Sequence, residues 1–412
     1  MKFCVLTFGC RANQADSFRI EEELCGRGHA AAPRESAELA VVNTCAVTAA
    51  AEHSARQAIR RLARENPAVR IAVTGCYATR RGDALDRLPN VVALVPNAEK
   101  ERLVEAIDDR PASSGAAAAG ILGPGARGRT IYPLQVQTGC DERCTYCVVP
   151  ATRGRSASRP AGAVAEEARR LAAAGYREVI LTGVHLGAWG RDLAPARGLV
   201  ELLDALDAIP VVFRLSSLEP MDCTSGIVDR LARPGSRFAP HLHLPLQHAS
   251  DRVLRLMRRP YTFDDFRRLS DTVGSRLPHA AIGTDVIAGF PGETGADFER
   301  LERALDELPL AYVHVFAYSD RPGTAAAGLG PKVPADVVRA RAGRLRERAA
   351  LVRRRFEEGQ AGATRPALTL GDGTTALTDN YLKVRIEPGR RRNERVRIHV
   401  GSGTPLRGEV VA

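Results

Sequence analysis

Apolar runs that end at a cysteine give the first quarter of the chain a repeated pattern. The runs cover residues 3–10, 39–45 and 69–76, each is followed by an Ala- and Arg-rich helical stretch, and a fourth apolar run covers 91–95. The terminal cysteines are 35 and 31 residues apart, the length of a βαβ unit. Because such crossovers are right-handed, the strands should be parallel neighbours. We predict an α/β domain over residues 1–110 with a doubly wound parallel sheet.

The middle of the chain alternates strand-like apolar runs with amphipathic helical stretches. The strand-like runs lie near 130–137, 178–183, 211–215, 240–246, 281–288 and 311–317. The helical stretches lie around 160–174, 197–208, 223–233, 249–258, 263–276 and 294–308. Six repeats are too few for the eight-stranded barrel, so we predict a partial (β/α)6 barrel over 130–357, open at the carboxyl ends of its strands. The Pro-, Ala-, Ser- and Gly-rich residues 111–129 should be the linker before it.

A different periodicity follows the barrel. An Arg-studded helical stretch runs from Pro334 to about Glu358, and the rest alternates with period two at 366–370, 381–386, 396–400 and 409–411. This pattern predicts a small antiparallel β-barrel over 358–412. Its basic run and its tyrosine suit a phosphate backbone with a stacking base. The expected RNA-binding residues are Tyr381, Lys383, Arg390, Arg391, Arg392, Arg395 and Arg397.

Composition and charge narrow the class of protein. With 412 residues and 44% hydrophobic content, the chain can form two or three globular domains. The formal net charge is +11, and residues 331–412 carry 18 Lys and Arg against 9 Asp and Glu. This asymmetry favours a polyanionic partner, although a solvated Arg-rich helix would also produce it. No run is long enough for a transmembrane helix and the apolar start at 3–8 is too short for a signal peptide, so we expect a cytoplasmic protein with no membrane partner.

Three cysteines form a compact motif directly after the first barrel strand: Cys140, Cys144 and Cys147, spaced Cys-x3-Cys-x2-Cys. In a reducing compartment this spacing indicates metal binding or catalysis rather than disulfides. Structural zinc needs a fourth protein ligand, and the next histidine is His185. A 4Fe-4S cluster held by three thiolates would keep one iron open for another ligand. We favour this cluster over zinc and over purely structural cysteines.

The cysteines that end the N-terminal strands form a second group. Parallel strands present their carboxyl ends at one edge of a sheet, so Cys10, Cys45 and Cys76 should converge there. We predict that they hold a second 4Fe-4S cluster, again with an open iron. The side chains beside them either bond its sulfurs or shape the turns, and they are Asn13, Asn43 and Thr44. Other candidates are interpreted as buried structural residues rather than metal ligands: Cys4, Cys25, Cys223, His241, His243 and His248.

The Cys-x3-Cys-x2-Cys motif is the signature of the radical S-adenosylmethionine enzymes, and the whole chain resembles the methylthiotransferases of that superfamily. It looks most like the branch that acts on N6-threonylcarbamoyladenosine at position 37 of tRNA. The motifs that carry this likeness are Thr7-Phe8-Gly9-Cys10-Arg11-Ala12-Asn13-Gln14, Asn43-Thr44-Cys45-Ala46-Val47-Thr48, Ser216-Ser217-Leu218-Glu219-Pro220 and His314-Val315-Phe316-Ala317-Tyr318-Ser319. The chain departs from the family at Leu246-Gln247-His248-Ala249-Ser250, where Leu-Gln-Ser-Gly-Ser is more usual.

The resemblance implies two 4Fe-4S clusters and S-adenosylmethionine as cofactors, with a C-terminal barrel of the TRAM type. One S-adenosylmethionine would methylate a sulfur at the Cys10/Cys45/Cys76 cluster. A second, cleaved at the other cluster, would give a radical that removes hydrogen from C2 of the adenine. The implied partners are tRNA, an electron donor such as flavodoxin or ferredoxin, and a sulfur source. The expected contacts to S-adenosylmethionine are Tyr146, Thr182, Gly183, Ser217, Glu219, Gln247 and Gly289.

Three alternatives stay open. In two of them the substrate is isopentenyladenosine of tRNA or an aspartate of a ribosomal protein, although the basic C-terminal region argues against the ribosomal protein. In the third, the chain is a non-catalytic iron-sulfur protein that binds RNA or senses redox state. Two sites with three cysteines each argue against it, because a structural cluster is better served by four ligands.

Overall fold

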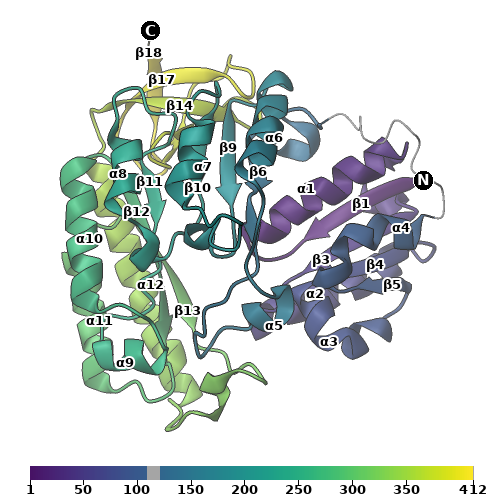
Figure 1. Cartoon of the computed structure of the whole chain (residues 1–412), viewed down its shortest axis with the longest axis horizontal. Helices are drawn as coiled ribbons and strands as arrows, with labels where there is room; N and C mark the ends of the chain where they lie inside the picture. Colours follow the sequence, from purple (N-terminus) through teal and green to yellow (C-terminus); the bar gives the residue numbers. More distant parts are fainter. Residues whose placement is uncertain (109–120, 412) are drawn as a thin grey trace.

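The computed structural model describes residues 1–108 and 121–411 and contains three groups of strands (Figure 1). The N-terminal sheet lies beside a central barrel, and the C-terminal strands, yellow in the figure, lie across one end of that barrel. The predicted α/β fold class is confirmed. The predicted linker at 111–129 lies outside the described residues as far as residue 120. No helix of the described residues is long and apolar enough to cross a lipid bilayer.

The N-terminal sheet is parallel, in the order β2-β1-β3-β4-β5. Its strands are β1 (Lys2–Thr7), β2 (Ala30–Ala31), β3 (Leu39–Thr44), β4 (Arg70–Gly75) and β5 (Val91–Val95). Two helices cover each face: α1 (Arg11–Gly26) with α4 (Leu103–Ile107), and α2 (Ala49–Glu65) with α3 (Cys76–Asp86). Strand β3 is buried on both sides, because Val41 packs toward α1 and α4 while Val42 packs toward α2 and α3. The predicted doubly wound sheet with parallel neighbours is confirmed.

Six parallel strands form the central barrel: β6 (Tyr132–Gln135), β9 (Glu178–Thr182), β10 (Val212–Leu215), β11 (His241–His243), β12 (Ala281–Ala288) and β13 (Tyr312–Ala317). They form two three-stranded sheets, which bridges from Phe213 to Phe238 and from Ser217 to His243 join edge to edge. The helices between them are α6 (Ala161–Ala173), α7 (Leu199–Leu206), α8 (Ser225–Ala232), α9 (Asp251–Leu256), α10 (Phe263–Arg276) and α11 (Gly295–Glu307). All six predicted strands and all six predicted helices are confirmed.

Three further elements position the site. The strand β7 (Gln137–Thr138) and the helix α5 (Val149–Arg153) flank the cysteine loop that follows the first barrel strand. The predicted Arg-rich helix is α12 (Ala335–Glu358), and it packs along β13. Helix α5, which follows the cysteine loop, packs against α3, so this loop lies at the junction of the barrel with the N-terminal domain (Figure 1).

The C-terminal strands form an antiparallel sheet in the order β16-β15-β14-β17-β18. They are β14 (Thr364–Leu370), β15 (Thr375–Thr378), β16 (Lys383–Arg385), β17 (Arg395–Val400) and β18 (Gly408–Val411). The sheet curls until its two edges meet. Arg385 N at the end of β16 donates to Leu406 O, just before β18, at 2.8 Å. The predicted small barrel is confirmed, but two details of the prediction are wrong. Strand β15 is additional, and Tyr381, expected in a strand, lies in a turn at φ 73°.

Arg214 on β10 joins the C-terminal barrel to the central one. The residue has no solvent exposure, and its Nε donates to Glu178 Oε1 at 2.9 Å. Its two terminal nitrogens donate to the carbonyl oxygens of Asp379 at 2.9 Å and Thr378 at 3.3 Å. The turn that contains Tyr381 is therefore fixed to the amino-terminal half of the barrel by buried polar contacts.

Arg214→Ala should destabilise the protein by about 3–5 kcal/mol, because Glu178 would stay buried without its partner. Urea unfolding followed by circular dichroism measures the effect. Arg230→Ala is the matched control, because Arg230 pairs with Asp204 at 2.8 Å at the protein surface and such pairs contribute little. Equal losses of stability for the two variants would contradict the role assigned to Arg214.

Candidate active site

The first three long strands of the N-terminal sheet deliver their cysteines to one edge. Strands β1, β3 and β4 pair in register up to their carboxyl ends. Cys45 and Cys76 follow β3 and β4 directly, and Cys10 comes shortly after β1, so all three cysteines lie at the same edge of the sheet. Gly9 has φ +90°, and a Cβ added there would lie 2.6 Å from Cys45 Sγ, so this turn requires glycine. Burial raises the pKa of the Cys45 thiol to about 11, and the thiols of Cys10 and Cys76 add to the effect. A bound metal centre would hold the three sulfurs as thiolates.

A buried network of side chains holds the cysteine-bearing turns together. Asn13 on α1 has no solvent exposure, and its Nδ2 donates to the carbonyl oxygens of Phe8 at 2.7 Å and Thr44 at 2.9 Å. Asn43 Nδ2 donates to Asn13 O at 2.9 Å, and Thr44 Oγ1 donates to Thr74 O at 2.6 Å. These side chains bond the main chain and fix the turns, which is the second of the two roles expected for them.

The loop between β7 and α5 carries the other three cysteines. Each sulfur accepts a hydrogen bond: Cys140 and Cys147 from main-chain nitrogens at 3.4 Å, and Cys144 from Arg259 at 3.1 Å. Hydrogen bonds to sulfur stabilise the ligands of iron-sulfur clusters. Burial raises the pKa of the Cys147 thiol to about 12, so this sulfur would ionise at neutral pH only on binding a metal.

Neither cysteine group is as compact as a single-ion site. In residues 1–108 and 121–411, one set of three His, Cys, Asp or Glu side chains has its ligand atoms within 4.8 Å of one another, and it is His243, Asp285 and His314. Neither cysteine group is that compact. Tetrahedral zinc with Zn–S bonds of about 2.3 Å holds its sulfurs about 3.8 Å apart. Neither cysteine group is therefore arranged as a zinc site in this structure.

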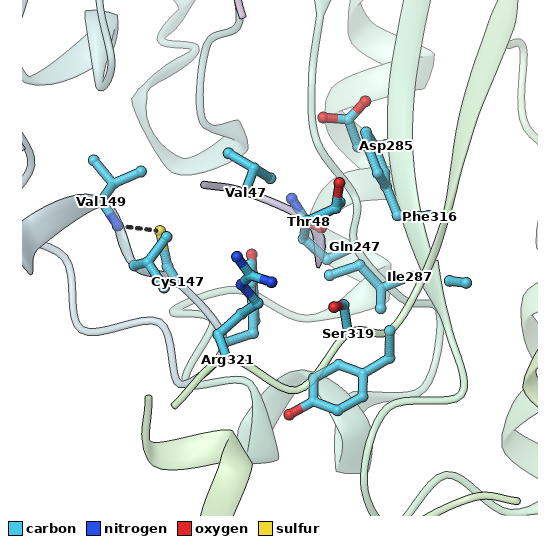
Figure 2. Close-up of a pocket in the computed structure, with 14 residues that line it drawn as sticks. Val47, Thr48, Cys147, Val149, Gln247, Asp285, Ile287, Phe316, Ser319 and Arg321 are labelled. Carbon is cyan, nitrogen blue, oxygen red and sulfur yellow. Dashed lines mark hydrogen bonds between the residues drawn. The ribbon is translucent and has the colours of Figure 1, made fainter. Parts of the chain in front are cut away.

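Two adjoining cavities lie between the N-terminal domain and the barrel, one lined by Cys10, Cys45 and Cys76 and the other by Cys147. The larger cavity, called the chamber here, has a volume of about 580 Å³ and is lined by all three parts of the fold, including Cys10, Arg11, Cys45, Cys76, Ser217, Asp285 and Tyr381. Figure 2 shows the smaller cavity, of about 180 Å³, which lies beside Cys147 and Arg321. The walls of the two cavities share Val47, Thr48, Val149, Asp285 and Phe316.

Two buried groups of ion pairs fix the N-terminal domain to the barrel beside these cavities. Arg153 on α5 donates to Asp16 of α1 at 2.8 Å, and Lys100 donates to the same carboxylate at 2.7 Å. Burial alone would raise the pKa of Asp16, but the two cations lower it overall. Arg321, which follows β13, pairs with Glu52 of α2. These contacts hold the two cysteine groups in a fixed relation.

Four of the residues predicted to contact S-adenosylmethionine line the cavities. Gly183 and Ser217 face the chamber, and Tyr146 and Gln247 face the smaller cavity. Gln247 has φ 64°, a conformation that is unfavourable for a residue with a side chain and that is found at binding sites.

The other three predicted contacts lie elsewhere. Glu219 forms an ion pair with Arg259, which also donates to Cys144, so Glu219 lies beside the cysteine loop. Thr182 is fully buried and Gly289 lies against α12, and neither lines the chamber or the smaller cavity.

The structure separates the predicted RNA-binding residues into three sets. Tyr381 lies in the wall of the chamber, and Lys383 lines an adjoining groove of about 410 Å³ between α12 and β13. Arg392 donates to the carbonyl oxygens of Gly371 at 2.7 Å and Gly125 at 2.8 Å, which precedes the first barrel strand. The remaining arginines of the set are exposed, and they are Arg390, Arg391, Arg395 and Arg397.

Sequence reasoning does not find the polar cluster formed by His243, Asp285 and His314. Asp285 accepts from His243 at 3.0 Å and from His314 at 3.1 Å. Burial would raise the pKa of Asp285, but these hydrogen bonds lower it to about 2. Asp285 and His314 stand opposite each other on β12 and β13, which only the strand register reveals. His248, grouped with His243 in the sequence, lies beside Glu293 instead.

Family models and solved structures match the two larger parts of the fold. Residues 2–96 match the Uncharacterized protein family UPF0004, and residues 134–305 match the Radical SAM superfamily. Among solved structures, the chain is similar to the radical S-adenosylmethionine methyltransferase TsrM from Kitasatospora setae. The TM-score is 0.52 at 16% identity, over 79% of this chain and 76% of that one. At this identity the likeness concerns the fold alone.

Curated relatives cover most of the chain. The threonylcarbamoyladenosine tRNA methylthiotransferase MtaB of Aquifex aeolicus is 32% identical over 97% of this chain and 100% of its own, and that of Thermotoga maritima is 35% identical over 88% and 85%. The tRNA-2-methylthio-N(6)-dimethylallyladenosine synthase of Novosphingobium aromaticivorans is 38% identical over 83% and 81%. With Cys10, Cys45, Cys76 and Cys147 lining adjoining cavities, these likenesses show that the chain belongs to the radical S-adenosylmethionine methylthiotransferases and is a tRNA-modifying enzyme.

Proposed function

We propose that the protein inserts a methylthio group at C2 of N6-threonylcarbamoyladenosine, at position 37 of tRNA, with two 4Fe-4S clusters. The observation that carries the proposal is the pair of adjoining cavities, one lined by Cys10, Cys45 and Cys76 and the other by Cys147. When bound, S-adenosylmethionine and the clusters supply a carbon-centred radical and the methylthio group. An aromatic C–H bond has neither an acidic proton nor a leaving group, so acid-base chemistry alone is inadequate.

The residues of the chain would hold the substrate base between the two cysteine groups. The larger cavity is within the usual range of small-molecule sites, about 300–1,000 Å³. Its walls combine the apolar side chains of Val47, Val149 and Phe316 with polar strand ends. Apolar walls exclude water and protect a reactive radical, while the ion pairs of Arg153 and Arg321 keep the walls in place.

The chamber wall is mostly apolar, but three polar side chains in it favour a polar substituent on the base. Arg11, His314 and Tyr381 line it, and the prenyl group of isopentenyladenosine has no atom that bonds to them. An aspartate side chain would satisfy these groups, but the relatives described above act on tRNA. A non-catalytic iron-sulfur protein is disfavoured, because both cysteine groups open onto cavities.

The tRNA would approach along the groove beside the chamber. Arg353 of α12 and Lys383 line this groove, and its wall shares Tyr312, His314 and Tyr381 with the chamber. Positive side chains at this position attract the phosphate backbone, and the exposed Arg390–Arg397 set would extend the contact. Flavodoxin or ferredoxin as the electron donor and a separate sulfur source complete the proposed set of partners.

Cys144→Ala should abolish cleavage of S-adenosylmethionine, whereas Cys45→Ala should retain cleavage but form no methylthio product. Anaerobic assays by mass spectrometry measure both products, and iron analysis should give about eight irons for the wild type and about four for each variant. Cys223→Ala is the matched control, because this cysteine is buried in the barrel core. Methylthio product from Cys45→Ala would contradict the second cluster.

A deletion strain should lack 2-methylthio-N6-threonylcarbamoyladenosine and accumulate its precursor without the methylthio group. Mass spectrometry of nucleosides from total tRNA measures both. The wild-type gene should restore the nucleoside, and the gene with Cys144→Ala should not. Loss of the methylthio derivative of isopentenyladenosine instead would show that the proposed substrate is wrong.

Lys383→Ala and Arg391→Ala should each weaken tRNA binding and reduce the slope of log affinity against log salt by about one. Filter binding over a range of salt concentrations measures the slope. Arg267→Ala is the control, because this arginine pairs with Asp264 on the outer helix α10. An unchanged slope for Lys383→Ala would exclude the groove as the path of the RNA. An unchanged slope for Arg391→Ala would exclude that arginine from the interface.

A further inference from the structure

The chamber contains a cation that the protein does not neutralise. Arg11, the residue after Cys10, is half-buried and lines the chamber. Its guanidinium donates to the hydroxyl of Tyr381 at 2.5 Å. Within residues 1–108 and 121–411, no carboxylate forms an ion pair with it.

Apart from the three cysteines, the other charged groups of the chamber already have partners. Asp285 is the sole acid among the described residues of the wall, and it accepts hydrogen bonds from His243 and His314. Arg153 pairs with Asp16, which lies outside the chamber wall. The charge of Arg11 is therefore left in a partly desolvated cavity, where an anionic ligand would stabilise it.

Tyr381 brings a hydroxyl of the C-terminal barrel to the same place. Its ring lies between two guanidinium groups, 5.8 Å from Arg11 and 5.2 Å from Arg214, and 4.3 Å from the ring of His241. Its φ of 73° is unfavourable for an aromatic residue, and the buried contacts of Arg214 with the same turn hold it there. Conformations of this kind are retained where surrounding contacts require them, often at binding sites. The hydroxyl accepts from Arg11 and keeps its own proton to donate.

We propose that Arg11 and the Tyr381 hydroxyl form a subsite that binds the carboxylate of the amino-acid substituent on the substrate base. The inference rests on the function proposed above and names the residues that would recognise the substituent. A carboxylate would accept hydrogen bonds from the guanidinium and the hydroxyl together, whereas a neutral prenyl group would leave Arg11 unpaired. A phosphate of the tRNA backbone offers the same oxyanion chemistry, so the experiment has to separate these two sources.

The experiment measures the binding of three anticodon stem-loops to the reconstituted holoenzyme. One carries N6-threonylcarbamoyladenosine, one carries the methyl ester of its carboxylate, and one carries unmodified adenosine. The wild type should bind the acid about tenfold to a hundredfold more tightly than the ester. Arg11→Gln should lower the affinity for the acid to that for the ester and leave the unmodified loop unchanged. Arg19→Gln, on the same helix, is the matched control and should behave as the wild type.

Two results would overturn the inference. One is an Arg11→Gln enzyme that keeps the wild-type preference for the acid over the ester. The other is an equal weakening of all three loops, which would assign Arg11 to a phosphate. Because Arg11 is next to Cys10, iron content is measured for each variant. If Arg11→Gln loses iron, the Tyr381→Phe variant is used to test the subsite instead. It removes a single oxygen and should reduce the preference for the acid over the ester about twofold to tenfold.

The same experiment distinguishes failure of the inference from failure of the proposed function. A wild-type enzyme that binds the acid and the unmodified loop equally, and that methylthiolates an isopentenyladenosine loop, would overturn the proposed function itself. If the wild type prefers the acid over the ester as expected and the Arg11→Gln enzyme shows the same preference, the subsite alone would be overturned.

Discussion

The arrangement of both cysteine groups depends on one buried amide, that of Asn13. Parallel strands bring Cys10, Cys45 and Cys76 to one edge, but the turns that follow leave main-chain carbonyls without partners in a helix or sheet. The side chain of Asn13 bonds two of those turns at once. Leaving one of these buried carbonyls without a partner would cost about 1–3 kcal/mol, so the Asn13 amide favours the observed arrangement of the turns. Arg153, which follows the other cysteine loop, also donates to Asn13, so the same side chain relates the two groups to each other.

The strands of this protein are predictable where burial on both faces makes them continuously apolar. Strand β3 is buried at all six of its positions, and its sequence is correspondingly apolar up to its last two residues. The prediction fails at 375–381, where local sequence is a weak guide. Strand β15 is short and half polar, so its pairing with β14 and β16 decides its structure. The left-handed conformation of Tyr381 depends on contacts with Arg11 and Arg214, which lie far away in the sequence.

The two cysteine groups are predictable from spacing, because three sulfurs that meet at one place require a short loop or equivalent strand ends. The polar side chains around the cysteines are not predictable from the sequence. Asp285 and His314 meet only through the register of β12 and β13. Arg11 and Tyr381 are 370 residues apart in the sequence and share a hydrogen bond. Clustered positive charge predicts RNA contact but not which side chains are available for it, and Arg392 bonds main-chain carbonyls of its own chain.

Tyr381, which forms part of the chamber wall, is synthesised long after the two cysteine groups. Both cysteine groups lie within the first 147 residues, and the tyrosine follows more than 200 residues later. At a translation rate of roughly 5–20 residues per second, the thiols of a nascent chain exist for about ten seconds or more before Tyr381 is added. During that time they are open to oxidation and to capture of the wrong metal, and also to delivery of clusters by other proteins. The order of synthesis thus gives cluster assembly an interval before the C-terminal barrel completes the wall of the chamber.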